Sequence, residues 1–158
     1  LIFQHHRIII SLQKYVKYIL DKPGLLSIEE NSAGNPEFTT EILNIDDDIT
    51  SQAKGYTYKK ILCACFDLAI LVNYSKKSFF KFVYHDGCLE NLDPRKRKNY
   101  LDLVEMLCKK YDIQYILSLI ESDLPIVDGN PYKLPSDCNI AVELSDKDDS
   151  TTLFGFTF

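Results

Sequence analysis

The sequence lacks the features of a membrane-spanning or exported protein. It has no run of eighteen or more apolar residues and no charged-then-apolar leader, so it predicts neither a membrane-spanning helix nor a signal peptide. The motifs G-x-x-x-x-G-K-[ST], G-x-S-x-G, H-E-x-x-H and G-x-G-x-x-G are also absent. Without the first of these, the chain cannot hold nucleotide phosphates in the manner of a P-loop by itself.

The sequence also lacks any pair of cysteines with the C-x-x-C spacing of a zinc site. The cysteines are five, an odd number, and several fall in apolar segments, where a thiol behaves as a small hydrophobe. These features predict structural thiols in a reducing, cytoplasmic protein. The five are Cys63, Cys65, Cys88, Cys108 and Cys138.

An excess of basic residues is missing as well. The net charge is −5, which argues against a strongly basic nucleic-acid-binding surface and leaves only a local basic patch open. With 158 residues, 46% of them hydrophobic and 26% charged, the chain predicts one soluble domain with a single core. It opens without an initiator Met in the middle of a helical pattern, so we expect a piece of a longer protein.

Hydrophobic periodicity and turn residues predict the secondary structure of the first half of the chain. Residues 1–21 have a helical stripe that ends at Pro23-Gly24. Residues 25–43 predict a hairpin around the turn "NSAGNP", and residues 46–56 predict a polar loop. The segment "YKKILCACFDLAILVNY" is hydrophobic nearly all round, so it predicts a long, central, buried helix.

The second half predicts a βαβ unit. The aromatic segment 78–86 and the segment 113–120 are expected to be buried strands, and residues 94–110 between them a helix. This order implies a parallel pair with a right-handed crossover. Residues 138–146 predict a further strand, and the apolar tail "TTLFGFTF" predicts one more strand or a docking segment.

Acidic residues gather where these two strands end. In a parallel pair both ends open on the same edge of the sheet, so these carboxylates could converge and bind Mg²⁺. Asp93 before Pro94 is also a plain helix start, and the last two acids of the group could be loop surface. The group consists of Asp86, Glu90, Asp93, Glu121 and Asp123.

Three other features have two interpretations each. Asp67 is either a buried or half-buried carboxylate paired with Lys or Arg, or a functional group. His85 is either a ligand or general base, or a hydrogen-bonded packing residue. The cations of residues 95–98 oppose the helix macrodipole, which favours an anionic partner, although a solvated helix face is the simpler interpretation.

Three stretches of the chain resemble a known family. These are "KGYTYKKILCACFDLAIL", "FFKFVYHDGCLENLD" and "ELSDKDDSTTLFGFTF". They resemble the C-terminal half of an ABC-type ATPase head of the SMC and RecN kind, and more closely a bacterial family of such ATPases known as a domain of unknown function. The resemblance implies an α/β lobe with a mostly parallel sheet, a hairpin and a long buried helix. Residues 1–22 would be the end of a coiled-coil arm and residues 23–158 the half-head.

The resemblance also implies functional residues. Asp86 would end the Walker B strand and hold Mg²⁺ through water, and Asn91, Leu92 and Asp93 would form the D-loop at a dimer interface. The loop Lys54, Gly55, Tyr56, Thr57 would occupy the position of the signature motif, where a helix N-terminus faces the partner's γ-phosphate. The P-loop would lie upstream, so Mg²⁺ and ATP are expected in the full protein and neither in this chain alone. A homodimer is implied, with DNA as a candidate partner and no membrane.

The sequence departs from that pattern at three places. Gly87 stands where these ATPases have a catalytic Glu, and Glu90 could replace it only if the turn brings it back. The signature Ser-Gly-Gly and the switch His are missing. Two alternatives therefore stay open: a Toprim-like, metal-dependent phosphoesterase or nuclease that uses Asp86, Glu90, Glu121 and Asp123, and a non-catalytic oligomerisation module.

Overall fold

The computed structural model describes residues 2–43 and 55–155. Most of the predicted loop 46–56, including Lys54, lies outside the described residues. The predicted first helix, hairpin, long helix and βαβ unit are confirmed. The elements are α1 (Ile2–Leu20), β1 (Gly24–Glu30), β2 (Pro36–Ile42), α2 (Tyr56–Tyr74), β3 (Phe82–Asp86), α3 (Pro94–Tyr111), β4 (Gln114–Ser118), η2 (Glu121–Asp123), β5 (Ile126–Val127), β6 (Asn130–Pro131) and η3 (Asp149–Thr151).

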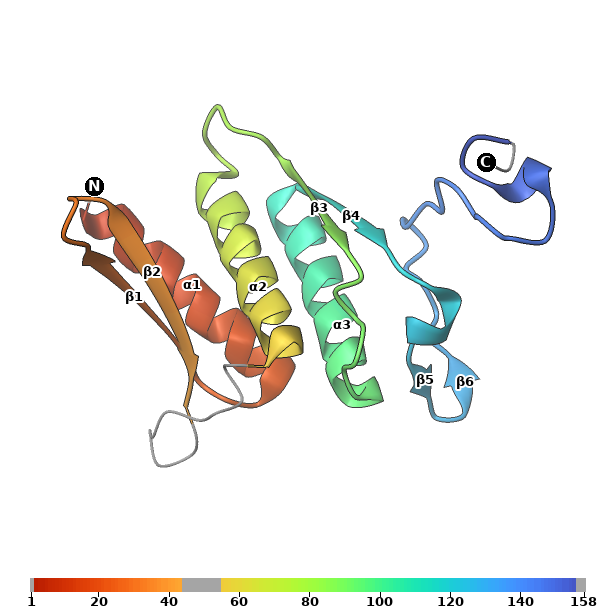
Figure 1. Cartoon of the computed structure of the whole chain (residues 1–158), viewed down its shortest axis with the longest axis horizontal. Coiled ribbons are helices and arrows are strands. Elements are labelled where there is room, and N and C mark those ends of the chain that lie inside the picture. Colours follow the sequence, from red (N-terminus) through yellow and green to blue (C-terminus); the bar gives the residue numbers. More distant parts are fainter. Residues whose placement is uncertain (1, 44–54, 156–158) are drawn as a thin grey trace.

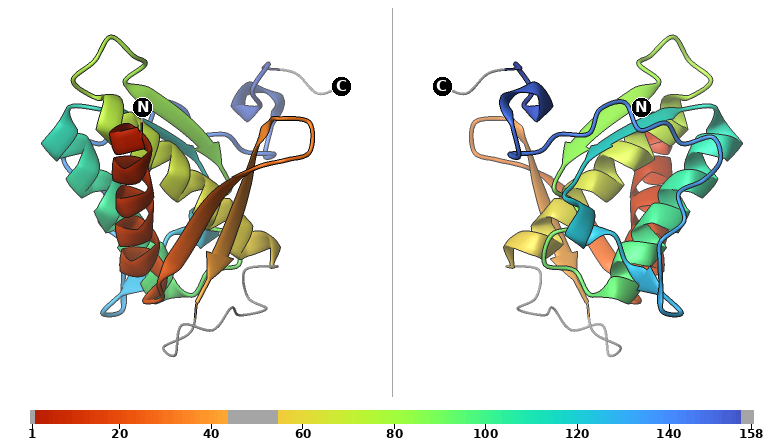
Figure 2. Two further views of the ribbon diagram at one scale, coloured as in Figure 1. Left: turned by 90° about the vertical axis from the view of Figure 1, so that its left-hand side faces the viewer. Right: turned by 90° about the vertical axis from the view of Figure 1, so that its right-hand side faces the viewer.

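Helix α1 buries one of its faces in the core. It packs against α2, α3 and β1, and Figures 1 and 2 show the hairpin β1–β2 beside it. Its buried face has helical spacing, because apolar side chains three and four residues apart lie on one side. A side chain at Gly24 would come within 2.8 Å of the buried Val16, so this close approach requires glycine. The buried residues are Ile8, Leu12, Tyr15, Val16, Ile19 and Leu20. The continuation of α1 into a coiled-coil arm stays a prediction.

Helix α2 lies between α1 and β3, as expected of a central helix. Eight of its 19 residues are buried. Asn73 donates to Ser11 Oγ at 3.0 Å, which ties α2 to α1 by a side-chain hydrogen bond as well as by apolar contact. Its other side is more open than the sequence predicted, since Cys63 is exposed. All five cysteines are free, as predicted.

Strands β3 and β4 form a parallel pair joined by α3, in the register Phe82↔Gln114 to Asp86↔Ser118. The expectation of a mostly parallel sheet is wrong for the described residues, which form three two-stranded sheets, two of them antiparallel. The predicted strand 138–146 is also absent, because in the described residues no neighbouring strand pairs with this exposed segment. Figure 1 shows the chain after β6 running away from the helices.

The expectation that β3 and β4 are buried is wrong for one of their two faces. Helices α2 and α3 cover the inner face, which carries Val83, His85, Tyr115 and Leu117. On the outer face Phe82 is 54% exposed, Tyr84 55% and Ile116 41%. Parallel sheets in globular proteins are normally covered on both faces, so this aromatic face lacks a covering layer in the described part of the chain.

None of the described helices is both long and apolar enough to cross a membrane.

Candidate functional site

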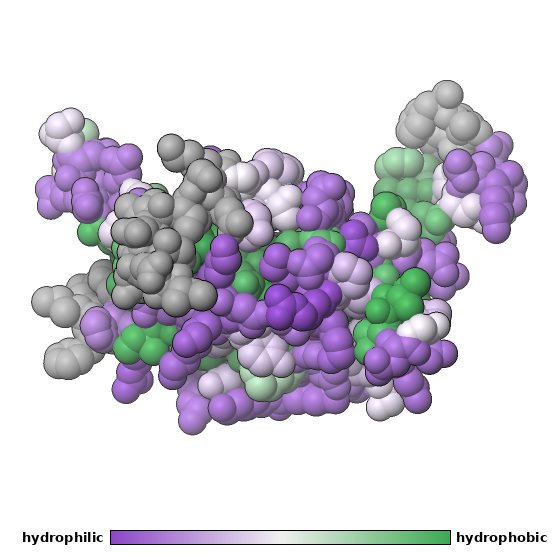
Figure 3. All heavy atoms as spheres, turned by 90° about the horizontal axis from the view of Figure 1, so that it is seen from below, coloured by the Kyte–Doolittle hydropathy of each residue, from purple (hydrophilic) through white to green (hydrophobic). Residues whose placement is uncertain are grey.

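The candidate residues gather at one end of the molecule. The N-termini of α2 and α3 lie at the lower side of Figure 1, and the turn that follows β3 runs down toward them. Figure 3 views the protein from this side, and the face is mostly hydrophilic, with hydrophobic residues in small separate patches. The topology therefore brings the turn after β3 and two helix starts to a common polar side of the molecule.

Asp86 is the acid at the end of β3. It is exposed and lies on the outer face beside Tyr84. Ser118, its register partner on β4, donates a hydrogen bond to Asp86 Oδ1 and lies 3.1 Å from the Tyr84 hydroxyl. Among the described residues no Lys, Arg or His forms an ion pair with Asp86. Its negative charge is therefore available to an external cation.

The turn after β3 brings Glu90 back toward Asp86. Gly87 has φ +58°, a left-handed conformation that favours glycine. A Cβ atom built on Gly87 would lie 2.7 Å from Glu90 Oε1, so the Glu90 carboxylate occupies the space of a side chain at position 87. Lys60 holds it there, with its Nζ 2.5 Å from Glu90 Oε2 and 3.1 Å from the Gly87 carbonyl oxygen. The hydrogen bond to Glu90 raises the pKa of Lys60.

Asn91, Leu92 and Asp93 connect this turn to α3. Asn91 is exposed with φ 57°, and Leu92 is buried. Asp93 is the N-cap of α3, accepting from the Lys96 backbone N–H at 3.0 Å, and Pro94 follows. The simpler interpretation of Asp93 as a helix start is therefore confirmed.

The four cations at the start of α3 are all paired with carboxylates of this chain. Because each charge is neutralised by an acid of the same chain, these cations are more typical of a structural helix face than of an open anion-binding patch. The pairs are Arg95–Asp21 at 2.6 Å, Lys96–Asp93 at 2.7 Å, Arg97–Asp123 at 3.1 Å, and Lys98–Asp102.

The predicted convergence of five carboxylates is wrong. Asp123 is buried against Arg97, Asp93 caps α3, and Glu90 is paired with Lys60. In the parts of the chain with assigned positions, no three His, Cys, Asp or Glu side chains are close enough to hold a metal ion together. No observation therefore favours the Toprim-like alternative, which needs Asp86, Glu90, Glu121 and Asp123 around one metal.

The start of α2 has little side-chain capping. Gly55 is its N-cap and provides no side-chain hydrogen bond. Tyr56, the first helical residue, is 73% exposed, and Thr57 is half-buried. The first N–H groups of a helix have no partner within the helix, so this end suits an anion.

Asp67 and His85 belong to a hydrogen-bonded chain on the inner face of the β3–β4 pair. His85 Nε2 lies 3.0 Å from Asp67 Oδ2, and His85 Nδ1 lies 2.7 Å from the Tyr115 hydroxyl. Tyr115 in turn bonds to the fully buried Tyr100. Burial raises the pKa of both phenols, which keeps them neutral. The partner of Asp67 is thus a histidine and not the predicted Lys or Arg, and His85 is a hydrogen-bonded packing residue.

We expect Tyr115→Phe to lower the free energy of unfolding by about 1–3 kcal/mol, because it removes the hydroxyl between His85 and Tyr100 and leaves buried polar atoms unsatisfied. Urea unfolding of the two proteins measures the difference. The matched control is Tyr84→Phe on the exposed face of β3, expected within about 0.5 kcal/mol of wild type. Equal effects for the two variants would contradict a stabilising role of the chain.

Sequence reasoning missed three residues of this region. Ser118 gave only a partial signal, because the ends of the two predicted parallel strands pair Asp86 with Ile120, two residues beyond Ser118. Lys60 gave no signal, since its contact with Glu90 spans 30 residues. The sequence identified Arg97 only as one cation of a basic cluster. It gave no sign of the ion pair with Asp123.

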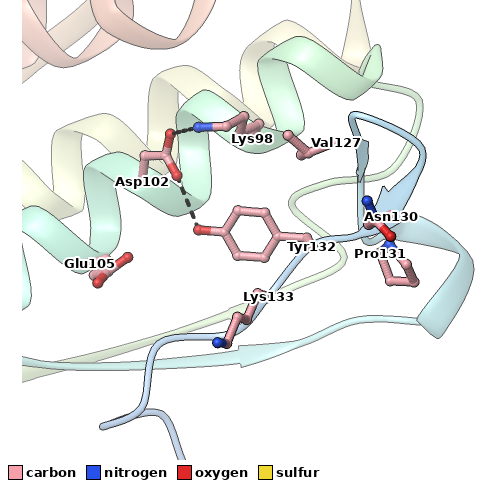
Figure 4. Close-up of a pocket in the computed structure, with 8 residues that line it drawn as sticks. All are labelled: Lys98, Asp102, Glu105, Val127, Asn130, Pro131, Tyr132 and Lys133. Atoms are coloured by element: carbon pink, nitrogen blue, oxygen red, sulfur yellow. Dashed lines mark hydrogen bonds and ion pairs between the residues drawn. The ribbon is translucent and has the colours of Figure 1, made fainter.

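A small open pocket of about 370 Å³ lies between α3 and the hairpin β5–β6. Figure 4 shows Tyr132 pointing to Asp102, and the hydroxyl donates to Asp102 Oδ1 at 3.1 Å. Lys98 pairs with the same carboxylate. Burial and the bond to Asp102 raise the pKa of Tyr132. Because these polar groups satisfy one another, we assign them to docking the hairpin on α3.

A family model described as "Uncharacterised protein conserved in bacteria (DUF2326)" matches residues 15–158. The chain belongs to this family. No curated protein matches it.

Solved structures of SMC heads share the fold of this DUF2326 chain. One, from work on ATP-driven dimerization and DNA-stimulated activation of SMC ATPases, is 18% identical, with a TM-score of 0.55 over 77% of this chain and 73% of that chain. An Smc head bound to the C-terminal winged-helix domain of ScpA is 14% identical, with a TM-score of 0.55 over 79% of this chain and 40% of the other. A Pyrococcus furiosus Smc head with an extended coiled coil, bound to the C-terminal domain of ScpA, is 17% identical, with a TM-score of 0.54 over 73% and 29%.

The chain therefore has a mixed α/β fold similar to part of an SMC head, as predicted. At these identities the likeness shows the fold alone. The chain spans less than half of the two larger head chains that it matches.

Proposed function

We propose that this chain is the C-terminal half of an SMC-like ATPase head and contributes to an ATP site that other polypeptide segments complete. The observation that carries the proposal is Asp86. It ends a strand of the parallel pair, is exposed, and is bound to Ser118 with no ion pair among the described residues. Neighbouring acids such as Glu90, Asp93 and Asp123 are each paired with a cation of this chain.

The residues fit a Mg²⁺ ion bound together with a nucleotide. Mg²⁺ in such sites keeps several waters and takes one or two protein oxygens plus phosphate oxygens, so it does not need a cluster of acids. Asp86 would hold it through water. When bound, the ion neutralises phosphate charge.

Glu90 would orient the attacking water. It would do so in place of the glutamate that related ATPases have at the position of Gly87. The support is the turn itself, which places the Glu90 carboxylate over Gly87. The loop Lys54–Thr57 would present the start of α2 to the partner's γ-phosphate, and Asn91–Asp93 would form the D-loop. The full protein would form a homodimer, with DNA as a candidate partner, and the P-loop would come from the upstream half.

The test is Asp86→Asn in the full protein. We expect Mg²⁺-dependent ATP affinity to fall about tenfold to hundredfold, because the amide keeps the shape but loses the charge that holds the ion. Calorimetric titration of Mg–ATP measures it. The control is Asp112→Asn, an exposed acid at the far end of α3, expected to bind as wild type. Equal affinity of Asp86→Asn and wild type would refute the proposal.

A further inference from the structure

Lys60 has an unusual position between two parts of the candidate site. It lies in the second turn of α2, and its ammonium reaches back toward the helix start, 5.0 Å from the centre of the Tyr56 ring. It also donates to Glu90 and to the Gly87 carbonyl oxygen in the turn after β3. One side chain therefore connects the first residue of α2 with the turn that follows Asp86.

The two oxygens of Glu90 have different surroundings. Lys60 binds Oε2 at 2.5 Å. Oε1 is the atom closest to a Cβ built on Gly87, and none of the hydrogen bonds described for the chain involves it. The pairing with Lys60 thus fixes the carboxylate and leaves one oxygen over Gly87 that can accept a bond from water.

The Lys60 side chain is more enclosed than that of Glu90. The exposed fractions of the two side chains are 19% and 49%. Lys60 therefore provides the fixed end of the pair, and Glu90 presents its carboxylate to solvent. A base that is held by a second residue keeps its orientation, and an error of about 1 Å in such geometry can cost about a hundredfold in rate.

We propose that Lys60 is a positioning residue that fixes the Glu90 carboxylate over Gly87. The carboxylate then lies where a side chain at position 87 would otherwise place one. The proposal rests on the proposed ATPase function. It implies that Gly87, Glu90 and Lys60 act together, since any side chain at position 87 would displace the Glu90 carboxylate.

The experiment uses the full protein and compares Lys60→Met with Lys59→Met, an exposed lysine one position away. For Lys60→Met we expect kcat for ATP hydrolysis to fall about tenfold to hundredfold with KM unchanged, because the nucleotide still binds and only the base loses its orientation. Lys59→Met should match wild type. Lys60→Arg should recover most of the rate, since a guanidinium can also bind the carboxylate.

The decisive comparison is the double variant Lys60→Met, Glu90→Gln. If Lys60 acts through Glu90, the double variant has the same kcat as Glu90→Gln alone, since residues that act as a unit are not additive. An additional loss in the double variant, a change in KM alone, or equal rates for Lys60→Met and Lys59→Met would overturn the positioning role. If Asp86→Asn left Mg–ATP binding intact, the proposed function itself would fail, so the two failures are distinguishable.

Discussion

Arg97→Met is expected to destabilise the protein by about 3–5 kcal/mol, because it leaves the carboxylate of Asp123 buried without its cation. Asp123 is 6% exposed and its Oδ1 lies 3.1 Å from Arg97 Nη2. Its Oδ2 has no hydrogen-bond partner among the described residues, so Arg97 provides most of the compensation for this charge. Removing one member of such a pair costs far more than removing both.

Arg97 also joins two backbone segments. Its Nε donates to the Leu92 carbonyl oxygen and its Nη1 to the Ser122 carbonyl oxygen, each at 2.9 Å. The first of these belongs to the proposed D-loop and the second to the turn after β4. The guanidinium therefore holds the two loops that follow the parallel strands in a fixed relation, and methionine can make none of these hydrogen bonds.

Urea unfolding measures the effect, with Lys98→Met as the matched control. Lys98 is the neighbouring cation, 41% exposed and paired with Asp102 one turn along the helix, so its removal should destabilise the protein far less than that of Arg97. Adding Asp123→Leu to Arg97→Met should recover part of the loss, since no buried charge then remains. A cost for Arg97→Met similar to that of Lys98→Met would show that Asp123 is not dependent on this partner.

The local elements of the fold could be predicted because their signals lie within short windows. The apolar spacing of α1, the turn residues between β1 and β2, and the aromatic run of β3 each specify an element without help from distant residues. The parallel pairing followed from the order strand, helix, strand. The register, which places Ser118 opposite Asp86, did not follow from the sequence, because the ends of the two predicted strands would have paired Asp86 with Ile120.

The wrong predictions concern the neighbours of a segment, meaning which strands pair with it and which layers cover it. Residues 138–146 contain an apolar run like that of a strand, and yet Ile140 and Val142 are 61% and 63% exposed. An apolar segment becomes a strand only when a neighbour supplies hydrogen bonds. The apolar runs of β3 and β4 likewise predicted two covered faces, and the described chain covers one.

The candidate site was predicted in part for a related reason. Asp86 follows from the end of a strand, and the position of Asp93 follows from the proline after it. The pairs Lys60–Glu90 and Arg97–Asp123 join residues 30 and 26 positions apart, so only the tertiary structure reveals them. Together with Lys96–Asp93, these pairs use three of the five carboxylates that the sequence predicted to converge, and of the five only Asp86 and Glu121 have no ion-pair partner among the described residues.

The exposed outer face of β3–β4 leads to the largest expected effect on assembly. Replacing Phe82 and Tyr84 together by Asp should weaken association with the proposed upstream half by about a hundredfold to ten-thousandfold, because burying each aromatic side chain contributes about 1.5–3 kcal/mol. Both residues point away from α2 and α3, so the fold of this chain should survive the change. Co-purification and calorimetry of the two halves expressed as separate chains measure the affinity.

Ile126→Asp provides the control for this experiment. Ile126 is 67% exposed, similar to the aromatic residues, but it belongs to the hairpin β5–β6 and not to the parallel pair. An effect confined to the Phe82 and Tyr84 variant would identify the outer face as the surface that the upstream half covers, because a parallel pair needs a second layer. Equal association of both variants would mean that the aromatic face stays open in the full protein, and Asp86, which lies on that face, would then have no second wall to complete a nucleotide site.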